Sequence, residues 1–263
     1  MSPEELNPHL AIAALALANA SYNEDWIHDA LKALGFTFRE SAQYSFCPTC
    51  SVHRVAFALG AQRILVDNEN WDLIVVTLRG TVDWTVEWLS NVAQVLQLSD
   101  AFELASREVM HSLFRFLAQF RHRNGGQGER TVFLVTGHSR GAAVANWVGA
   151  RLGEFDWTDD ASIYVYAFAT PGIAKESRAC PFIINILNRN DYMVRLMLHD
   201  QRFGQTIFFN PKRVPGFAYW FTRKTKGLTY NSFRKGHAHE EPAFMAFLWA
   251  LAQEKTSFAN ELA

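Results

Sequence analysis

The spacing of hydrophobic and polar positions changes repeatedly along this chain, and the changes predict strands that alternate with helices. Apolar residues at helical spacing predict helices over 8–22, 24–34, 85–95, 102–121 and 242–253. Short β-branched and aromatic runs predict strands over 52–59, 73–78, 131–136, 163–169 and 182–187. This alternation favours an α/β fold with a largely parallel sheet, whose functional residues lie beyond the carboxyl ends of the strands.

Length and composition fit one domain spanning residues 1–263, with helices and a first strand over 1–70. The chain is 49% hydrophobic and 19% charged, which is ordinary for a globular protein. Its net charge of −1 argues against a broad nucleic-acid footprint, and no apolar run reaches the length of a membrane span.

The most specific local signal is Gly137-His138-Ser139-Arg140-Gly141, which follows a β-branched strand and precedes an Ala-rich helical segment. A G-x-S-x-G sequence between strand and helix is typical of a nucleophile elbow, where the glycines allow a turn so tight that the serine hydroxyl is lifted above the sheet. The backbone N–H groups of the helix start then lie where an oxyanion could form. The pattern predicts a serine hydrolase.

A serine nucleophile needs a base and an orienting acid. In the α/β-hydrolase order these follow the serine as acid and then histidine. Asp191 is favoured as the acid because it comes almost directly after the strand 182–187. The later histidines are His199, His237 and His239, of which the last two lie on a loop before the final helix.

Several motifs resemble the class 3 lipase (fungal lipase-like) family of the α/β-hydrolase superfamily. Residues 75–92 resemble its "FRGT…DW…NL" signature, and 137–143 resemble "GHSLGGA", with Arg140 in place of leucine. Residues 166–172 and 185–191 resemble its "YTFGAPRVG" and "VNxxDxVPxLP" segments. The resemblance covers roughly residues 70–250 and implies an α/β-hydrolase fold, with a mostly parallel central sheet and helices on both faces.

Position by position, the resemblance implies Ser139 as nucleophile, Asp191 as orienting acid and His239 as base, with His237 as the alternative. It also implies an oxyanion hole formed by Thr81 and the backbone N–H of Arg140, and no cofactor. The implied activity is hydrolysis of carboxylic esters, acylglycerol-like lipids in particular, through an acyl-Ser139 intermediate. The alternatives are an acyltransferase, a thioesterase or a phospholipase with the same residues, and a catalytically weak lipid-binding protein.

Residues 201–239 contain eight Lys or Arg residues and no acidic residue, interleaved with aromatic side chains. Because the segment lies between the predicted acid and base, it is expected to form a lid-like excursion over the active-site mouth that touches anionic lipid surfaces. The alternative is an aromatic excursion packed on the core with solvated basic tips.

Two other features carry weaker expectations. Cys47 and Cys50 are expected to be reduced thiols in a loop. The alternative is a Cys3His zinc site formed with His53 and Cys180. The apolar stretch 10–18 before Ala20 imitates a secretory signal, but Glu4 and Glu5 precede it and no Lys or Arg does. We therefore expect a packed first helix and a cytoplasmic protein, with secretion as the alternative.

Overall fold

The computed structural model describes residues 2–45, 54–80, 98–155, 161–189, 191, 201–209 and 244–253. Within them, seven strands form one sheet in the order β1-β2-β3-β4-β5-β6-β7. The strands are β1 (Phe38–Ala42), β2 (Phe57–Val66), β3 (Glu69–Leu78), β4 (Arg130–His138), β5 (Ala161–Phe168), β6 (Ile183–Asn188) and β7 (Gln205–Phe209). The β1-β2-β3 pairs are antiparallel, and every pairing from β3 to β7 is parallel. The expected mostly parallel sheet is confirmed.

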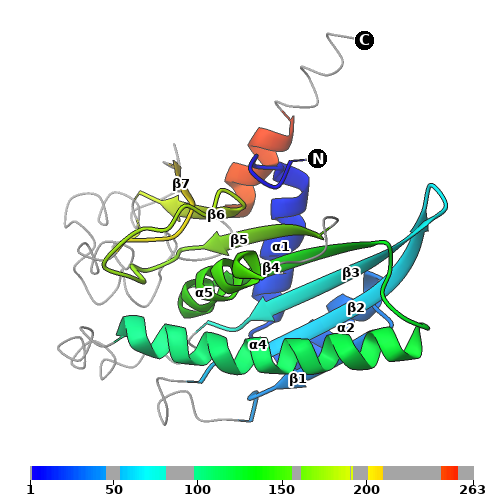
Figure 1. Ribbon diagram of the computed structural model, residues 1–263. Coiled ribbons are helices and arrows are strands. Elements are labelled where there is room, and N and C mark those ends of the chain that lie inside the picture. The colour runs from blue at the N-terminus through cyan, green and yellow to red at the C-terminus, as the bar shows by residue number, and fades with distance from the viewer. Residues whose placement is uncertain are drawn as a thin grey trace.

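Helices cover both faces of this sheet (Figure 1). One face carries α4 (Leu98–Arg123) and α5 (Arg140–Glu154), which follow β3 and β4 in the chain. The other face carries α1 (Pro8–Ala20), α2 (Glu24–Ala33) and the helix of residues 244–253. Successive crossovers on one face, each returning to the next parallel strand, are the right-handed connections expected of such sheets.

Local sequence explains where several elements begin. The side chain of Asn7 accepts a hydrogen bond from the N–H of Leu10 at the start of α1, and Pro8 occupies the first turn, where no N–H is needed. Asn23 caps α2 in the same way. The β2–β3 hairpin turns at Asp67 and Asn68, both with positive φ, as a tight two-residue turn requires.

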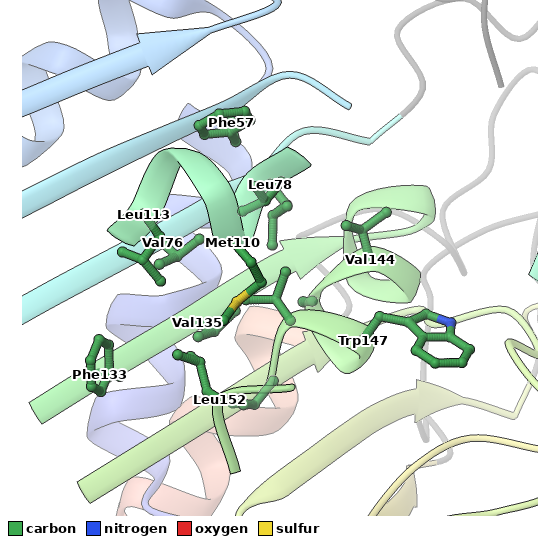
Figure 2. Packing of buried hydrophobic residues seen from close by; sticks show 14 of the residues in the cluster. Phe57, Val76, Leu78, Met110, Leu113, Phe133, Val135, Val144, Trp147 and Leu152 are labelled. Carbon is green, nitrogen blue, oxygen red and sulfur yellow. The ribbon is translucent and has the colours of Figure 1, made fainter. Parts of the chain in front are cut away.

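The larger core lies between the sheet and the α4–α5 pair. Figure 2 shows strand residues Val76 and Val135 packed with Met110 and Leu113 from α4 and with side chains from α5. Gly149 lets α5 approach the sheet closely, because a Cβ there would lie 2.6 Å from Cγ2 of Val165. This packing fixes α5, and therefore its first turn, against the central strands.

A second cluster, on the opposite face, anchors the last described helix. Phe244 and Leu248 are fully buried there with α1 residues and with Tyr166, Phe168 and other residues of β5 to β7. The C-terminal helix is thereby held against the central strands near their carboxyl ends.

The predicted helices at 8–22, 24–34 and 102–121 are confirmed, and α4 is longer than expected by several residues at its start. The strand expected at 52–59 is wrong in its bounds: β2 runs from Phe57 to Val66, because it pairs along the whole of β3. Sequence patterning missed β1, which is half-buried throughout, and β7, which lies inside the segment expected to be a lid-like excursion. The helix expected at 85–95 lies outside the described residues.

None of the helices in the described part of the chain is both long and apolar enough to cross a bilayer.

Candidate active site

The strand β4 leads into α5 through a strained residue, Ser139. Its backbone has φ 57° and ψ −122°, a conformation that side-chain-bearing residues rarely adopt and that costs on the order of 1–3 kcal/mol. The strain is held by the surrounding chain: the N–H of Ser139 donates to the carbonyl of Phe168 at 2.9 Å, and its carbonyl accepts from the N–H of Ala143 at 3.2 Å. The predicted strand–elbow–helix geometry is therefore present in the backbone.

The two glycines of the elbow are required by close backbone approaches. A Cβ on Gly137 would lie 2.5 Å from the carbonyl carbon of Gly141, on the other side of the turn. A Cβ on Gly141 would lie 2.1 Å from the carbonyl oxygen of Leu78, at the end of β3. The first turn of α5 is thus pressed against the end of β3, and no side chain fits between them.

The turn after β3 is packed just as tightly. The N–H of Arg79 donates to the carbonyl of Ala56 at 2.9 Å, and a Cβ on Gly80 would lie 2.1 Å from the hydroxyl oxygen of Tyr22. Thr81, the next residue, lies outside the described residues. The close approach of α5 to Leu78 and Arg79 brings the start of α5 beside this turn, as the predicted oxyanion hole requires.

Tyr22, just after α1, is a site residue that sequence reasoning missed. Its hydroxyl is 2.8 Å from Nδ1 of His138, the residue before Ser139, and it occupies the space that a side chain at position 80 would need. Burial raises the pKa of Tyr22, so the hydroxyl stays protonated. One N-terminal side chain therefore contacts both the elbow and the turn after β3. No motif in residues 1–70 indicates this role for Tyr22. The contacts with His138 and with the turn at Gly80 reveal it only in the structure.

Arg140 and Arg79 lie at the same edge of the sheet. Nη2 of Arg140 donates to the carbonyl of Arg54 at 2.5 Å, and Nη1 of Arg79 donates to the carbonyl of Tyr44 at 3.4 Å. Burial lowers the pKa of Arg140 to about 10, and the nearby positive charge of Arg79 acts in the same direction. Both groups are charged at neutral pH.

Asp191 follows β6 and is buried, with 1% of its surface exposed. Its N–H donates to the carbonyl of Asn188 at 3.0 Å. The guanidinium of Arg202 lies close enough for the Asp191 charge to oppose the burial that lowers the pKa of Arg202 to about 10. Nε of Arg202 also donates to the carbonyl of Thr170, which follows β5, at 2.7 Å. Sequence reasoning did not single out Arg202.

A buried amide pair links the elbow helix to β6, the strand that precedes Asp191. Nδ2 of Asn146 in α5 donates to Oδ1 of Asn185 in β6 at 2.9 Å, and Nδ2 of Asn185 donates to the carbonyl of Phe203 at 2.8 Å.

Because β4, β5 and β6 are neighbouring parallel strands, Ser139, Thr170 and Asp191 follow them at one edge of the sheet. The expected convergence of these strand ends is confirmed.

The three candidate bases, His199, His237 and His239, lie outside the described residues. The nearest described residue after His239 is Phe244, whose ring lies 6.2 Å from the His138 ring, edge to face, and 5.9 Å from the Phe168 ring. The segment bearing His237 and His239 therefore leads into a helix that begins against the elbow. Cys47, Cys50 and His53 also lie outside, while Cys180 is buried with a free thiol.

Comparison with a family model identifies what this site is similar to. Residues 75–200 match the family model described as lipase (class 3). The matched residues are those of a lipase/esterase-type hydrolase. The matched segment includes Ser139 and Asp191 and ends before His237. No curated protein sequence matches the chain.

Several solved structures are similar at low identity. The M37 lipase is 14% identical, with 72% of this chain and 69% of that chain covered and a TM-score of 0.44. A mutant form of MDLA from Penicillium cyclopium is 15% identical, with 90% and 97% covered and a TM-score of 0.45. A fungal lipase is 15% identical, with 80% and 81% covered and a TM-score of 0.42. The sheet and elbow described above have the arrangement of the α/β-hydrolase fold.

Proposed function

We propose that this protein hydrolyses carboxylic esters of acylglycerol-like lipids through an acyl-Ser139 intermediate. The observation that carries the proposal is the backbone of Ser139, held at φ 57° between β4 and α5 by glycines that no other residue could replace. Such strain costs free energy that the surrounding structure must supply. It is characteristic of a site where a side chain must be presented for chemistry.

The proposed hydrolysis has two steps, formation of the acyl-enzyme and its hydrolysis. Oγ of Ser139 bonds to the ester carbonyl carbon while His239 takes its proton, and the carbon–oxygen bond to the alcohol then breaks as His239 protonates the leaving oxygen. Water repeats the sequence on the acyl-enzyme and releases the carboxylic acid. Asp191 holds the imidazole in its reactive tautomer and stabilises the imidazolium.

Support for Asp191 as the acid comes from its position and its burial. Burying a carboxylate costs folding free energy unless a charged or hydrogen-bonding partner compensates, so such a residue is often retained for a function. Asp191 follows the strand two places from β4 in the sheet, on the edge that bears Ser139, and Arg202 lies near it.

Support for a base from the segment 237–239 comes from chain reach. Phe244 comes five residues after His239, and an extended chain of that length spans at most about 18 Å. Phe244 packs against His138, which directly precedes Ser139. An imidazole on this segment can therefore approach the nucleophile. His239 is preferred over His237 on the family resemblance.

The oxyanion hole is proposed to consist of the N–H of Arg140 and the backbone and hydroxyl of Thr81. The contact of Gly141 with Leu78 and Arg79 supports this pairing, because it brings the start of α5 beside the turn after β3. Loss of one such donor costs about 3 kcal/mol in the transition state.

The test is labelling with a fluorophosphonate, which reacts with an activated serine hydroxyl and releases fluoride. We expect one adduct per chain, on the peptide that contains Ser139, and none after heat denaturation or in Ser139→Ala. Ser106, a buried serine whose hydroxyl donates to the carbonyl of Glu103, serves as an internal control and should stay unlabelled. An unlabelled native protein would overturn the proposal and favour a lipid-binding protein.

The substrate class needs a separate measurement. Release of fatty acid from acylglycerols, compared with p-nitrophenyl esters of increasing acyl length, tests the lipid assignment. Addition of a competing alcohol tests the alternative of acyl transfer, since a transferase would form the new ester in preference to the free acid.

Contact with a lipid surface through residues 201–239 is also part of the proposal. Residues 210–239 of this segment lie outside the described residues, and the argument rests on their basic and aromatic composition. Sedimentation with anionic and neutral vesicles tests it, and equal, negligible binding to both would remove it.

A further inference from the structure

Thr170 follows β5, the strand that lies between the nucleophile strand and the strand before the proposed acid. In the sheet, β5 pairs with β4 on one side and with β6 on the other (Figure 1). Neighbouring strands lie about 4.8 Å apart, so the ends of β4 and β6 are about 10 Å apart. A base that contacts both Ser139 and Asp191 therefore lies over the end of β5, whichever histidine supplies it. Thr170 is at that end.

Backbone hydrogen bonds hold the residues before Thr170 in register with both neighbouring strands. The N–H of Ser139 donates to the carbonyl of Phe168, the last residue of β5, at 2.9 Å. The N–H of Ala169 donates to the carbonyl of Ile186 in β6 at 3.1 Å. The end of β5 is thereby fixed to the elbow on one side and to β6 on the other.

The backbone just before Thr170 is strained in the same sense as the elbow. Ala169 has φ 51°, close to the φ 57° of Ser139. Alanine has no side-chain oxygen to favour this left-handed conformation, unlike Asp67 and Asn68 in the β2–β3 hairpin. Such strain persists where the surrounding structure imposes it, and it is concentrated at functional sites.

The hydroxyl of Thr170 is buried without a hydrogen bond. The residue has no exposed surface, and no donor or acceptor in the described part of the chain pairs with its Oγ1. Two other buried threonines differ. The hydroxyl of Thr77 donates to the carbonyl of Ala58 at 3.3 Å, and that of Thr136 donates to the carbonyl of Tyr166 at 3.0 Å. Burying an unpaired hydroxyl costs folding free energy, so this exception needs a reason.

Thr170 and Asp191 share a neighbour, Arg202. Nε of Arg202 donates to the carbonyl of Thr170 at 2.7 Å, and the charges of Arg202 and Asp191 interact. Asp191 is itself buried after β6, and a carboxylate offers about four acceptor positions, of which an imidazole occupies one. A buried donor and a buried acceptor therefore lie at neighbouring strand ends.

We propose that Thr170 is a positioning residue whose hydroxyl donates a hydrogen bond to the carboxylate of Asp191 in the substrate-bound enzyme. The bond orients the acid toward the base that it must hold. Catalytic hydrogen bonds are often long or misaligned in a free enzyme and shorten only in the complex with substrate. This inference rests on the proposed function, since it adds a residue to the same site.

The first test asks whether stability and activity change in opposite directions. Thr170→Val replaces the hydroxyl by a methyl group of similar shape. Because the hydroxyl has no partner in the free protein, its loss should raise the melting temperature by about 2–4 °C. The same variant should lower kcat for p-nitrophenyl butyrate about tenfold, the effect of one hydrogen bond to a charged group, with KM unchanged.

Two further variants isolate the hydroxyl. Thr170→Ser keeps the hydroxyl and removes only a buried methyl group, so it should melt at a lower temperature and retain kcat. Thr77→Val is the matched control, because it removes a buried hydroxyl that has a partner. Thr77→Val should lower the melting temperature and leave kcat unchanged.

Action through Asp191 is tested by combining Thr170→Val with Asp191→Asn. Residues that act through one another have non-additive effects. If the hydroxyl acts on the carboxylate, kcat of the double variant should equal that of Asp191→Asn alone. A further loss of about tenfold in the double variant would show that the two residues act independently and would overturn the proposal.

The other outcomes are equally decisive. A Thr170→Val protein with unchanged kcat, or one that melts below the intact protein, contradicts the proposal, as does loss of kcat in Thr170→Ser. Failure of the proposed function is seen elsewhere, as hydrolysis that persists in Ser139→Ala or full activity in Asp191→Asn. The two failures therefore cannot be confused.

Discussion

The two sides of the candidate site differ in how strictly the backbone defines them. On the nucleophile side, Ser139 is held in a strained turn, and glycines 137 and 141 lie where any side chain would collide with main-chain atoms. On the acid side, Asp191 follows β6, its N–H donates to the carbonyl of Asn188, and no glycine contact of this kind restricts the described residues beside it. One side is fixed by sterics, the other by the placement of a charge.

This difference explains why the nucleophile side is easier to recognise in a sequence than the acid side. A turn that excludes every Cβ leaves glycine as the residue that fits, so the requirement is visible as a fixed spacing. A carboxylate that only has to hydrogen-bond an imidazole can do so from many backbone conformations. Its position is therefore marked only weakly in the sequence.

The strongest test of the nucleophile side is the substitution Ser139→Ala. If Ser139 is the nucleophile, kcat should fall by about 10⁶, the loss measured in another serine-hydrolase triad. Hydrolysis of a soluble p-nitrophenyl ester measures this directly. Ser106→Ala is the control, because it also removes a buried serine hydroxyl, and its kcat should stay near that of the intact protein.

The acid side is tested by Asp191→Asn, for which we expect kcat to fall by about 10⁴ because the amide favours the wrong imidazole tautomer. The matched control is Asp72→Asn, another buried aspartate, which pairs with Arg63 at 2.7 Å and accepts from the N–H of Gly128. Asp72→Asn should lower the free energy of unfolding by about 3 kcal/mol and leave kcat of the folded protein unchanged. Similar kcat values for the two variants would remove Asp191 from the triad.

Most of the fold could be predicted because its strands and helices carry strong periodicity. The buried strands near the centre of the sheet and the amphipathic helix α4 were recognised from their apolar patterns. The edge strand β1 was missed because all five of its residues are half-buried, so no alternation marks it. The strand β7 was missed because its polar and exposed positions resemble an excursion until it pairs with β6.

The local structure around the candidate site could be predicted where its residues lie in sequence motifs. The elbow geometry of Ser139 agrees with the sequence, and Asp191 is buried at the expected strand end. The catalytic roles of Ser139, Asp191 and His239, and those of Thr81 and Arg140 in the oxyanion hole, stay predictions. Tyr22 and Arg202 could not be predicted, because each acts through a contact with a residue far away in sequence, His138 for one and Thr170 for the other.

The steric basis of the elbow is tested by Gly141→Ala. The added Cβ would lie 2.1 Å from the carbonyl oxygen of Leu78, so β3 and α5 must separate. We expect a loss of about 3 kcal/mol in the free energy of unfolding, measured by urea titration, together with a loss of activity. Gly125→Asn is the control. Gly125 has φ 73°, a conformation that asparagine tolerates, and open space around it. The free energy of unfolding of this variant should change little.

The smallest effect is expected for Tyr22→Phe, which sharpens the comparison by asking whether the elbow depends on the N-terminal segment. The substitution keeps the ring that packs beside Gly80 and removes only the hydroxyl that contacts His138. Loss of this hydrogen bond should cost about 1 kcal/mol of stability and lower kcat several-fold, because His138 directly precedes Ser139. Tyr166→Phe removes another buried hydroxyl, whose partner is the N–H of Asn7, and should cost similar stability with kcat unchanged. If the two variants lower kcat equally, the Tyr22 contact only stabilises the fold and the elbow is held by its own strands and glycines.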